Sequence, residues 1–175
     1  MSSFSTMIIG TSMLDKEILD VCCGGKMFWF DKKNQNTLYL DKRREGAGIV
    51  EKWQPNFEVN PDLVMDFRNL DLPDESFSLI VFDPPHIFNK GISTDRSVMA
   101  KKYGTLHWDT WKDDLSKGFD ECWRVLRPKG TLIFKWHDHQ VKIREVVNCF
   151  SKQPLFGQRS GKGGKSHWLV FFKES

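Results

Sequence analysis

Short apolar runs recur along the chain, and the clearest of them stops abruptly. Residues 78–82 read Ser-Leu-Ile-Val-Phe and are followed by Asp83, Pro84, Pro85 and His86. A continuous apolar run of this length is typical of a strand that is buried on both faces. No strand can continue through Asp-Pro-Pro, because proline lacks the N–H group that a sheet needs. The pattern therefore predicts a central strand that ends at Asp83.

Three apolar runs upstream of this strand also end in acidic or glycine-rich positions. They are residues 17–20, which lead into the small-residue turn 21–25, residues 37–41, which end in Asp41, and residues 62–67, which end in Asp66 and Phe67. We expect each run to be a strand with a polar group at its carboxyl end. The segment after the first run, residues 26–32, can open a helix whose N-terminal dipole would favour an anion.

Downstream of the central strand the pattern becomes irregular, then helical, then extended again. Residues 87–105 show no sustained periodicity, and a loop of that length is usually functional or mobile, so we expect a mobile loop on the substrate side. Residues 108–126 have apolar side chains at helical spacing, and Arg-Pro-Lys-Gly at 127–130 would end that helix. The remaining expected elements are a strand at 131–136, a helix at 141–150, and two strands at 154–156 and 167–172.

The alternation of strands and helices predicts an α/β fold with a mostly parallel sheet. A length of 175 residues suits one domain but is too short for a catalytic domain plus a second one for recognition. We therefore expect a single domain over residues 1–175, without a separate target-recognition domain. Any recognition would then depend on loops, a partner subunit or a homodimer.

The composition excludes membrane proteins and disulfide-stabilised secreted proteins. Hydrophobic residues make up 39% of the chain and charged residues 28%, which is ordinary for a soluble protein, and no apolar stretch approaches the length of about 20 residues that spans a membrane. The N-terminus lacks the basic start of a signal peptide. None of the four cysteines has the spacing of a zinc site. We expect a cytoplasmic protein with reduced thiols and no metal.

Positive charge is concentrated towards the C-terminus. From Gln140 onwards there are seven lysine and arginine residues against two acidic residues, which gives this part a net charge of +5 and leaves −2 for the rest. Three of these cations, Arg159, Lys162 and Lys165, lie in the glycine-rich segment 157–166. The segment is no phosphate-binding loop of the GxxxxGK[ST] type, because position 159 is arginine and a strand follows. It predicts either a basic loop that contacts a polyanion or an ordinary solvated hairpin.

In open α/β sheets, ligands bind beyond the carboxyl ends of the strands. The acidic residues at these strand ends therefore form one candidate site. Small residues in the turn 21–25 let backbone amides approach a ligand closely. Asp41 could accept hydrogen bonds from both hydroxyls of a ribose, Asp66 could accept one from an exocyclic amine, and Phe67 could pack on a purine. Taken singly, these side chains could equally be turn acids and a core ring. The dinucleotide fingerprint GxGxxG is absent, which disfavours a dehydrogenase.

The order of these strand ends resembles class I S-adenosylmethionine-dependent methyltransferases over nearly the whole chain. The resemblance implies a Rossmann-like domain with a seven-stranded, mostly parallel sheet, an antiparallel last strand and helices on both faces. It also implies S-adenosylmethionine as cofactor. The residues that would bind it are Asp20, Cys22, Cys23, Gly24, Gly25, Asp41 (the ribose acid), Asp66 (the adenine acid) and Phe67. Lys26 departs from this family pattern, because it stands where the last glycine of the motif is usual.

Asp83-Pro84-Pro85-His86 resembles the (Asp/Asn)-Pro-Pro-aromatic motif of amino-methyltransferases, and the compact chain looks like small stand-alone enzymes of phage and prophage origin. Asp83 and the Pro84 carbonyl could accept the two N–H groups of an exocyclic amine, and the prolines would hold both acceptors rigidly. His86 replaces the usual aromatic residue and could stack on the base or hydrogen-bond to it.

The motif thus implies methylation of a nucleic-acid base, of the N6-adenine or N4-cytosine type, with DNA or RNA as partner and contacts from Arg159, Lys162 and Lys165. Two other interpretations stay open. One is a methyltransferase that acts on a small molecule or a protein amide, since the same acceptors suit any planar nitrogen. The other is a non-catalytic subunit with the methyltransferase fold.

Overall fold

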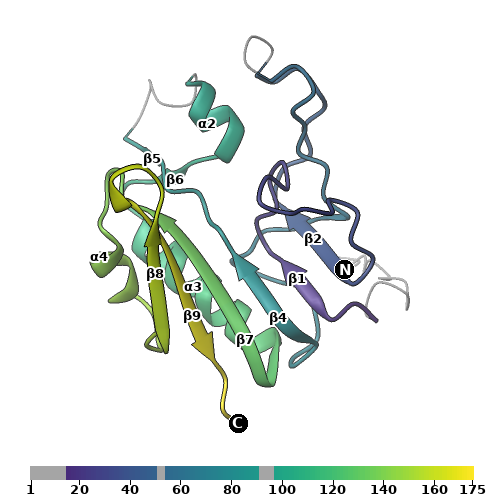
Figure 1. Ribbon diagram of the computed structural model, residues 1–175, viewed down its shortest axis with the longest axis vertical. Helices are drawn as coiled ribbons and strands as arrows, with labels where there is room; N and C mark the ends of the chain where they lie inside the picture. The colour runs from purple at the N-terminus through teal and green to yellow at the C-terminus, as the bar shows by residue number, and fades with distance from the viewer. Residues whose placement is uncertain (1–14, 51–53, 91–96) are drawn as a thin grey trace, which may run out of the picture.

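The computed structural model describes residues 15–50, 54–90 and 97–175, and a seven-stranded sheet runs through them (Figure 1). The strand order is β3-β2-β1-β4-β7-β9-β8. The bounds are β1 (Ile18–Asp20), β2 (Thr37–Asp41), β3 (Leu63–Val64), β4 (Phe77–Phe82), β7 (Leu126–His137), β8 (Phe156–Ser160) and β9 (Ser166–Phe172). All neighbouring pairs from β3 to β7 are parallel, and β9 is antiparallel to both β7 and β8. The expected mostly parallel sheet with an antiparallel last strand is confirmed.

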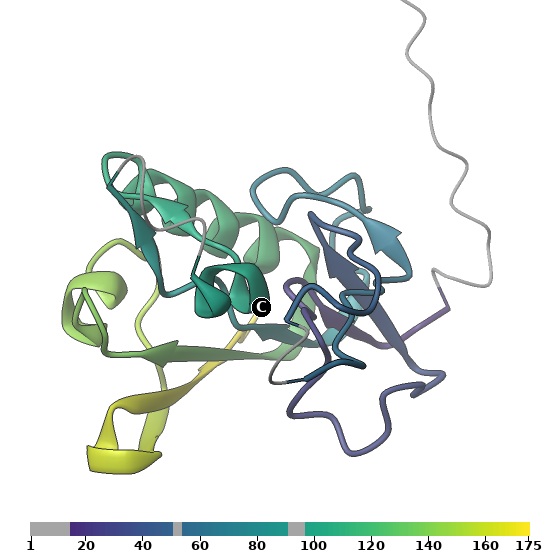
Figure 2. The same ribbon diagram turned by 90° about the horizontal axis from the view of Figure 1, so that it is seen from above.

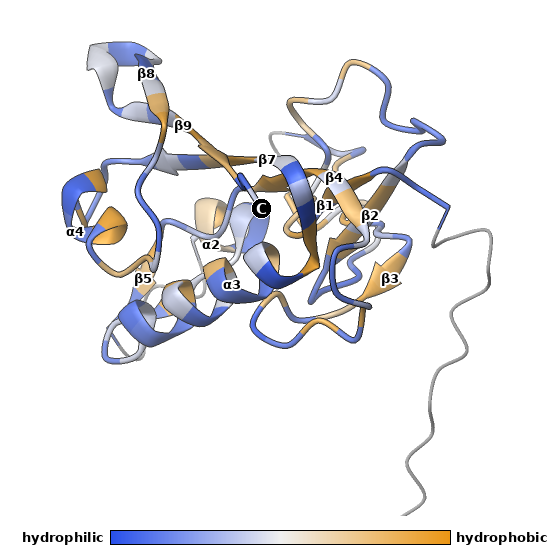
Figure 3. Cartoon of the chain, turned by 90° about the horizontal axis from the view of Figure 1, so that it is seen from below, coloured by the Kyte–Doolittle hydropathy of each residue, from blue (hydrophilic) through white to orange (hydrophobic). Residues whose placement is uncertain are grey.

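One face of the sheet packs against α3 (Trp111–Val125) and α4 (Ile143–Val147) (Figure 3). Leu115, Phe119 and Cys122 of α3 are fully buried against the apolar side chains of β4 and β7. Gly118 lets α3 come close, because a Cβ there would lie 2.4 Å from the Phe67 ring. The helix expected at 108–126 is confirmed, and the one expected at 141–150 is present but shorter.

On the opposite face, the described residues differ from the sequence-based expectation over β1 and β2. This face is covered there by turns in residues 26–36, which include the segment 26–32 where a helix was expected. Figure 2 shows this dark purple loop on the side of the sheet away from α3. Asp31 and Asn34 each accept a hydrogen bond from the backbone N–H two residues further on. Such local bonds compete with helix formation, which explains why the predicted helix is absent.

Aromatic side chains of this loop provide the burial that a helix would otherwise give. The Trp29 ring meets Tyr39 of β2 edge-on, with ring centroids 5.2 Å apart. The neighbouring Phe28 ring meets Trp168 of β9 in the same way at 5.7 Å. The loop therefore reaches from the second strand of the sheet to the antiparallel strand near its far edge.

The stretch 87–105 is more ordered than its sequence pattern suggests. It contains β5 (Phe88–Asn89), which pairs with β6 (Leu106–His107), and the helix α2 (Val98–Tyr103), whose N-cap Ser97 accepts a hydrogen bond from the Ala100 N–H. Residues 91–96 lie outside the described ranges, and the predicted mobility of the loop stays a prediction.

Two smaller differences concern the ends of strands. β7 begins at Leu126, because the Arg-Pro-Lys-Gly turn is incorporated as an irregularity in which Lys129 has a φ of 62°. β8 begins at Phe156 and is joined to β9 through the short 3-10 helix η2 (Lys162–Gly164). Among the helices of the described residues, none has the length and apolar character needed to cross a membrane.

Candidate functional site

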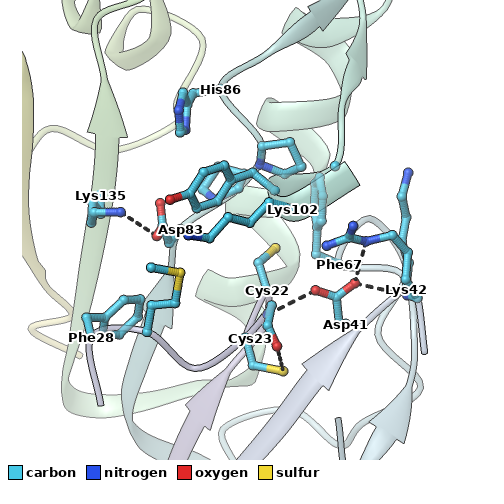
Figure 4. A pocket seen from close by; sticks show the side chains of 18 of the residues that line it. Cys22, Cys23, Phe28, Asp41, Lys42, Phe67, Asp83, His86, Lys102 and Lys135 are labelled. Carbon is cyan, nitrogen blue, oxygen red and sulfur yellow. Dashed lines mark hydrogen bonds and ion pairs between the residues drawn. The ribbon is translucent and has the colours of Figure 1, made fainter. Parts of the chain in front are cut away.

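A pocket at the carboxyl ends of β1, β2 and β4 gathers most of the residues that the sequence singles out (Figure 4). We call it the central pocket. It measures about 920 Å³ when the open solvent at its mouth is included. The lining residues that the sequence predicts as cofactor-binding or catalytic are Cys22, Cys23, Gly24, Gly25, Asp41, Phe67, Asp83, Pro84, Pro85 and His86. The other lining residues are Met27, Phe28, Lys42, Arg43, Phe57, Lys102, Tyr103, Gly104 and Lys135.

Asp20 lies beneath this pocket rather than in its wall. Its fully buried carboxylate accepts hydrogen bonds from the Cys22 N–H at 3.2 Å and the Trp29 indole N–H at 2.7 Å. Burial raises the pKa of Asp20 to about 7, although both hydrogen bonds act in the opposite direction. Asp20 therefore fixes the turn after β1 from below, and any contact of its own with a cofactor stays a prediction.

The turn after β1 is held in a form that exposes backbone to the pocket. Gly24 has a φ of 48°, a conformation that favours glycine, and its N–H donates to Asp41 Oδ2 at 3.0 Å. Gly25 lies so close to Phe57 that a Cβ would come within 2.4 Å of its ring. Lys26 adopts a φ of 52°, and its ammonium group lies over the Tyr39 ring at 3.9 Å instead of entering the central pocket.

Asp41 at the end of β2 connects the turn to the helix α2. Its Oδ1 accepts from the Arg43 N–H at 2.9 Å and from Arg43 Nε at 3.3 Å. The same guanidinium donates to the Lys101 carbonyl of α2 at 2.9 Å. Since a carboxylate offers about four lone-pair positions, the almost buried Asp41 retains capacity for a hydroxyl donor from the pocket.

The structure separates Asp66 from its neighbour Phe67. Phe67 is buried and lines the central pocket, whereas Asp66 does not line it. The Asp66 carboxylate accepts hydrogen bonds from Arg68, including one from Nε at 2.9 Å, and Arg68 also pairs with Asp114 of α3 at 2.9 Å. These bonds hold the pKa of Asp66 below its usual value despite partial burial. The proposed bond from Asp66 to an adenine amine stays a prediction.

Asp83 follows β4 and forms an ion pair that the sequence analysis did not identify. Lys135 of β7 donates to Asp83 Oδ2 at 2.6 Å, across two neighbouring strands (Figure 4). Burial raises the pKa of Asp83, and Lys135 opposes that shift. A possible signal was present, since Lys135 is the one charged residue in the apolar run 131–136.

His86 is surrounded by aromatic rings from other elements. Its ring centroid lies 5.7 Å from that of Tyr103 on α2 and 5.4 Å from that of His137 on β7. Burial, with a further contribution from Lys135, lowers the pKa of His86 to about 4, so the imidazole is neutral at pH 7. Tyr103 was missed by the sequence analysis, because it falls in the stretch that has no regular pattern.

The basic hairpin tip lies at the same edge of the sheet as His86. His137 Nδ1 lies 3.0 Å from Ser166 Oγ at the start of β9, and the Lys165 carbonyl accepts from the Asp138 N–H at 2.8 Å. Arg159, Lys162 and Lys165 are exposed and do not line the central pocket. The contact of this loop with a polyanion stays a prediction.

Comparisons with known proteins identify the fold. The sequence matches no family model and no curated protein. Among solved structures, the chain is similar to a Leishmania major SAM-dependent methyltransferase, with a TM-score of 0.51, 13% identity, and coverage of 88% of this chain and 63% of that one. It is also similar to the Burkholderia thailandensis 1,6-didemethyltoxoflavin-N1-methyltransferase with bound S-adenosylhomocysteine, with a TM-score of 0.50, 11% identity, and coverage of 90% and 71%. At these identities the likeness concerns the fold, and this chain has the fold of class I SAM-dependent methyltransferases.

Proposed function

We propose that the protein is an S-adenosylmethionine-dependent methyltransferase that acts on an exocyclic amino group of a nucleic-acid base, N6 of adenine or N4 of cytosine. The observation that carries the proposal is the central pocket, which joins the turn after β1, the acid at the end of β2 and the Asp-Pro-Pro-His segment after β4. One cavity thus offers groups suited to a nucleoside cofactor beside groups suited to an amine.

The residues of the pocket fit the proposed cofactor. The Gly24 and Gly25 backbone can lie against it, Asp41 can accept from its ribose hydroxyls, and Phe67 can pack on its adenine. When bound, S-adenosylmethionine supplies an electrophilic methyl group on a sulfonium. A solved structure of the same fold contains S-adenosylhomocysteine, which agrees with this assignment.

In this reaction the Asp-Pro-Pro-His segment would orient the exocyclic amine, which is a poor nucleophile. The lone pair of an exocyclic amine is delocalised into the ring, so the nitrogen reacts only if it becomes pyramidal. Asp83 and the Pro84 carbonyl can accept its two N–H groups and stabilise that geometry, and the two prolines keep the acceptors in place before the substrate arrives. The neutral His86 and the nearby Tyr103 offer rings against which a flat base can pack.

The charges of the pocket favour a neutral amine over a cationic one. Four cations line it, Lys42, Arg43, Lys102 and Lys135, against the two acids Asp41 and Asp83. A protonated alkylamine, such as a lysine side chain, would be repelled by this excess and by the sulfonium. A nucleobase is neutral and is attached to phosphates that this excess and the basic hairpin would attract.

The test is transfer of tritiated methyl groups from S-adenosylmethionine to single-stranded DNA, duplex DNA, RNA and protein extract, followed by mass spectrometry of the labelled nucleosides. We expect label in N6-methyladenine or N4-methylcytosine, with more transfer to single strands, because flipping a base out of a duplex costs a few kcal/mol. The variant Asp83→Ala is the matched inactive control.

Three results would contradict the proposal in different ways. Label confined to small molecules or to protein amides would replace the nucleic-acid substrate with the corresponding alternative. Cofactor binding without transfer to any acceptor would indicate a non-catalytic subunit. Calorimetry that detects no binding of S-adenosylmethionine or S-adenosylhomocysteine would refute the cofactor itself.

A further inference from the structure

The ion pair between Lys135 and Asp83 lies in the wall of the central pocket. The distance from Lys135 Nζ to Asp83 Oδ2 is 2.6 Å, and the two side chains are 23% and 16% exposed. In the sequence of β7, Lys135 lies between Phe134 and Trp136, which are fully buried. Because side chains alternate along a strand, Lys135 points to the opposite face, where the core does not require a cation. The pair is placed where the chemistry of the pocket would take place.

Besides its ion pair with Asp83, the Lys135 side chain is flanked by two aromatic rings. Its ammonium group lies 5.8 Å from the centre of the Phe28 ring and 5.7 Å from that of the Trp168 ring, within the range of cation–π attraction. Trp168 is its register partner on β9. Contacts from the loop, from the neighbouring strand and from Asp83 together hold the ammonium in one place.

Only one oxygen of Asp83 is used by this pair. Within the described ranges, Oδ2 accepts from Lys135, and no hydrogen bond to Oδ1 is found. A carboxylate fixed through one oxygen presents the other in a set direction. Oδ1 therefore remains for a ligand in the central pocket.

We propose that Lys135 is a positioning residue for Asp83: its ammonium group pairs with the carboxylate through Oδ2 and leaves Oδ1 directed at the target amine. This inference rests on the proposed function. In the transfer, the amine nitrogen forms a bond to the methyl carbon, the carbon–sulfur bond breaks with its electron pair going to sulfur, and an N–H proton passes to Asp83 and then to water. Ionised Asp83 is the form that can both accept the N–H bond and take this proton.

The charges around Asp83 indicate what removal of the lysine would do. The groups that interact electrostatically with Asp83 are Lys135 from β7 and Asp20 and Cys22 from the end of β1. His86 from its own turn and Lys102 and Tyr103 from α2 line the same pocket. Burial raises the pKa of Asp83, and of these groups Lys135 is the one that counteracts it. Without Lys135, Asp83 would take up a proton at higher pH and lose its acceptor role there.

The first test compares Lys135→Met with wild type across pH. Because a neighbouring cation lowers a carboxyl pKa by about 1–3 units, we expect the acid limb of kcat/KM to move upward by at least about one pH unit, and kcat at pH 7 to fall about tenfold or more, with unchanged affinity for S-adenosylmethionine. Lys135→Arg should restore part of the rate. In an Asp83→Asn background, where no charge needs a partner, Lys135→Met should cause little further loss.

The matched control is Lys112→Met. Lys112 is an exposed lysine on α3 that lies 5.6 Å from the centre of the Trp111 ring and does not line the central pocket. It should leave the pH profile unchanged. An unmoved acid limb in Lys135→Met would refute the inference. A loss of cofactor affinity equal to the loss of rate would make Lys135 a cofactor ligand instead.

The second test is independent of activity. Carbon-13 NMR of the Asp83 carboxyl group in the free protein should show its titration at higher pH in Lys135→Met than in wild type, by at least about one unit. An equal titration in both proteins overturns the inference even if the variant is slow. Absence of methyl transfer by wild type to every acceptor, alongside a shifted Asp83 titration, would overturn the proposed function and leave the ion-pair effect established.

Discussion

The hydrogen bond from Trp29 to Asp20 offers a sharp test of how the turn after β1 is built. Asp20 is fully buried, and the indole N–H of Trp29 lies 2.7 Å from its Oδ2. The substitution Trp29→Phe keeps a ring in place against Tyr39 and removes the donor. The remaining N–H donor to Asp20 in the described residues is that of Cys22, at the longer distance of 3.2 Å.

The size of the effect should depend on pH. A hydrogen bond to an ionised group contributes about 1.5–3 kcal/mol and one between neutral groups about 0.5–1.5 kcal/mol. With a pKa of about 7, Asp20 is largely protonated at about pH 5.5 and ionised at about pH 8.5. We therefore expect Trp29→Phe to lower the free energy of unfolding by about 1 kcal/mol more at the higher pH.

The direction follows from proton binding. The pKa of Asp20 in the folded protein is raised from the unfolded value of 3.8 to about 7. Between these values the folded protein holds a proton that the unfolded chain has released, so the contribution of Asp20 to stability decreases as pH rises towards 7. Loss of the Trp29 donor raises the folded pKa further and extends this decrease to higher pH.

Urea unfolding followed by circular dichroism at the two pH values would measure the effect. The double-mutant cycle with Asp20→Asn supplies the control, because asparagine does not ionise, and the extra loss at high pH should disappear in that background. The same loss at both pH values in the Asp20 background would refute the reasoning, since it would show that Trp29 contributes through packing alone.

Three further predictions concern the proposed function. Asp41→Ala should weaken binding of S-adenosylhomocysteine by about 1.5–3 kcal/mol in calorimetry, and unchanged affinity would remove Asp41 from the site. Asp83→Ala should abolish methyl transfer with cofactor affinity nearly intact; if cofactor binding is also lost, Asp83 is a structural residue or a cofactor ligand. Replacing Arg159, Lys162 and Lys165 together by alanine should flatten the slope of log K for nucleic acid against log salt by about 2–3 units without changing base preference, whereas an unchanged slope would make the loop ordinary surface.

The parts of the fold that sequence reasoning predicted are those determined by local chemistry. The β4 strand has to stop near Asp83 because Pro84 and Pro85 cannot continue it, and Gly24 marks a turn because it takes a positive φ. The same applies to α3, whose apolar spacing is visible in the sequence alone. Parallel pairing then brings the strand ends to one edge.

The parts that could not be predicted depend on residues far apart in the chain. Lys135 meets Asp83 across 52 positions, and Arg68 meets Asp114 across 46. The first pair places the cation of Lys135 in the central pocket. The second pair holds Arg68, which also donates hydrogen bonds to Asp66. No periodicity encodes either contact, because each results from the packing of two complete elements.

The failed helix prediction at 26–32 has a consequence for the site. Trp29 of that loop donates a hydrogen bond to Asp20 beneath the turn after β1. The adjacent Phe28 flanks Lys135, which pairs with Asp83. In this segment of turns the Phe28 and Trp29 rings stack with their centroids 6.0 Å apart, and one short segment reaches both Asp20 and Lys135. A helix over the same residues would space its side chains by turns and could not present Phe28 and Trp29 side by side in this way. The loop thus connects the groups proposed to hold the cofactor with the pair proposed to hold the amine.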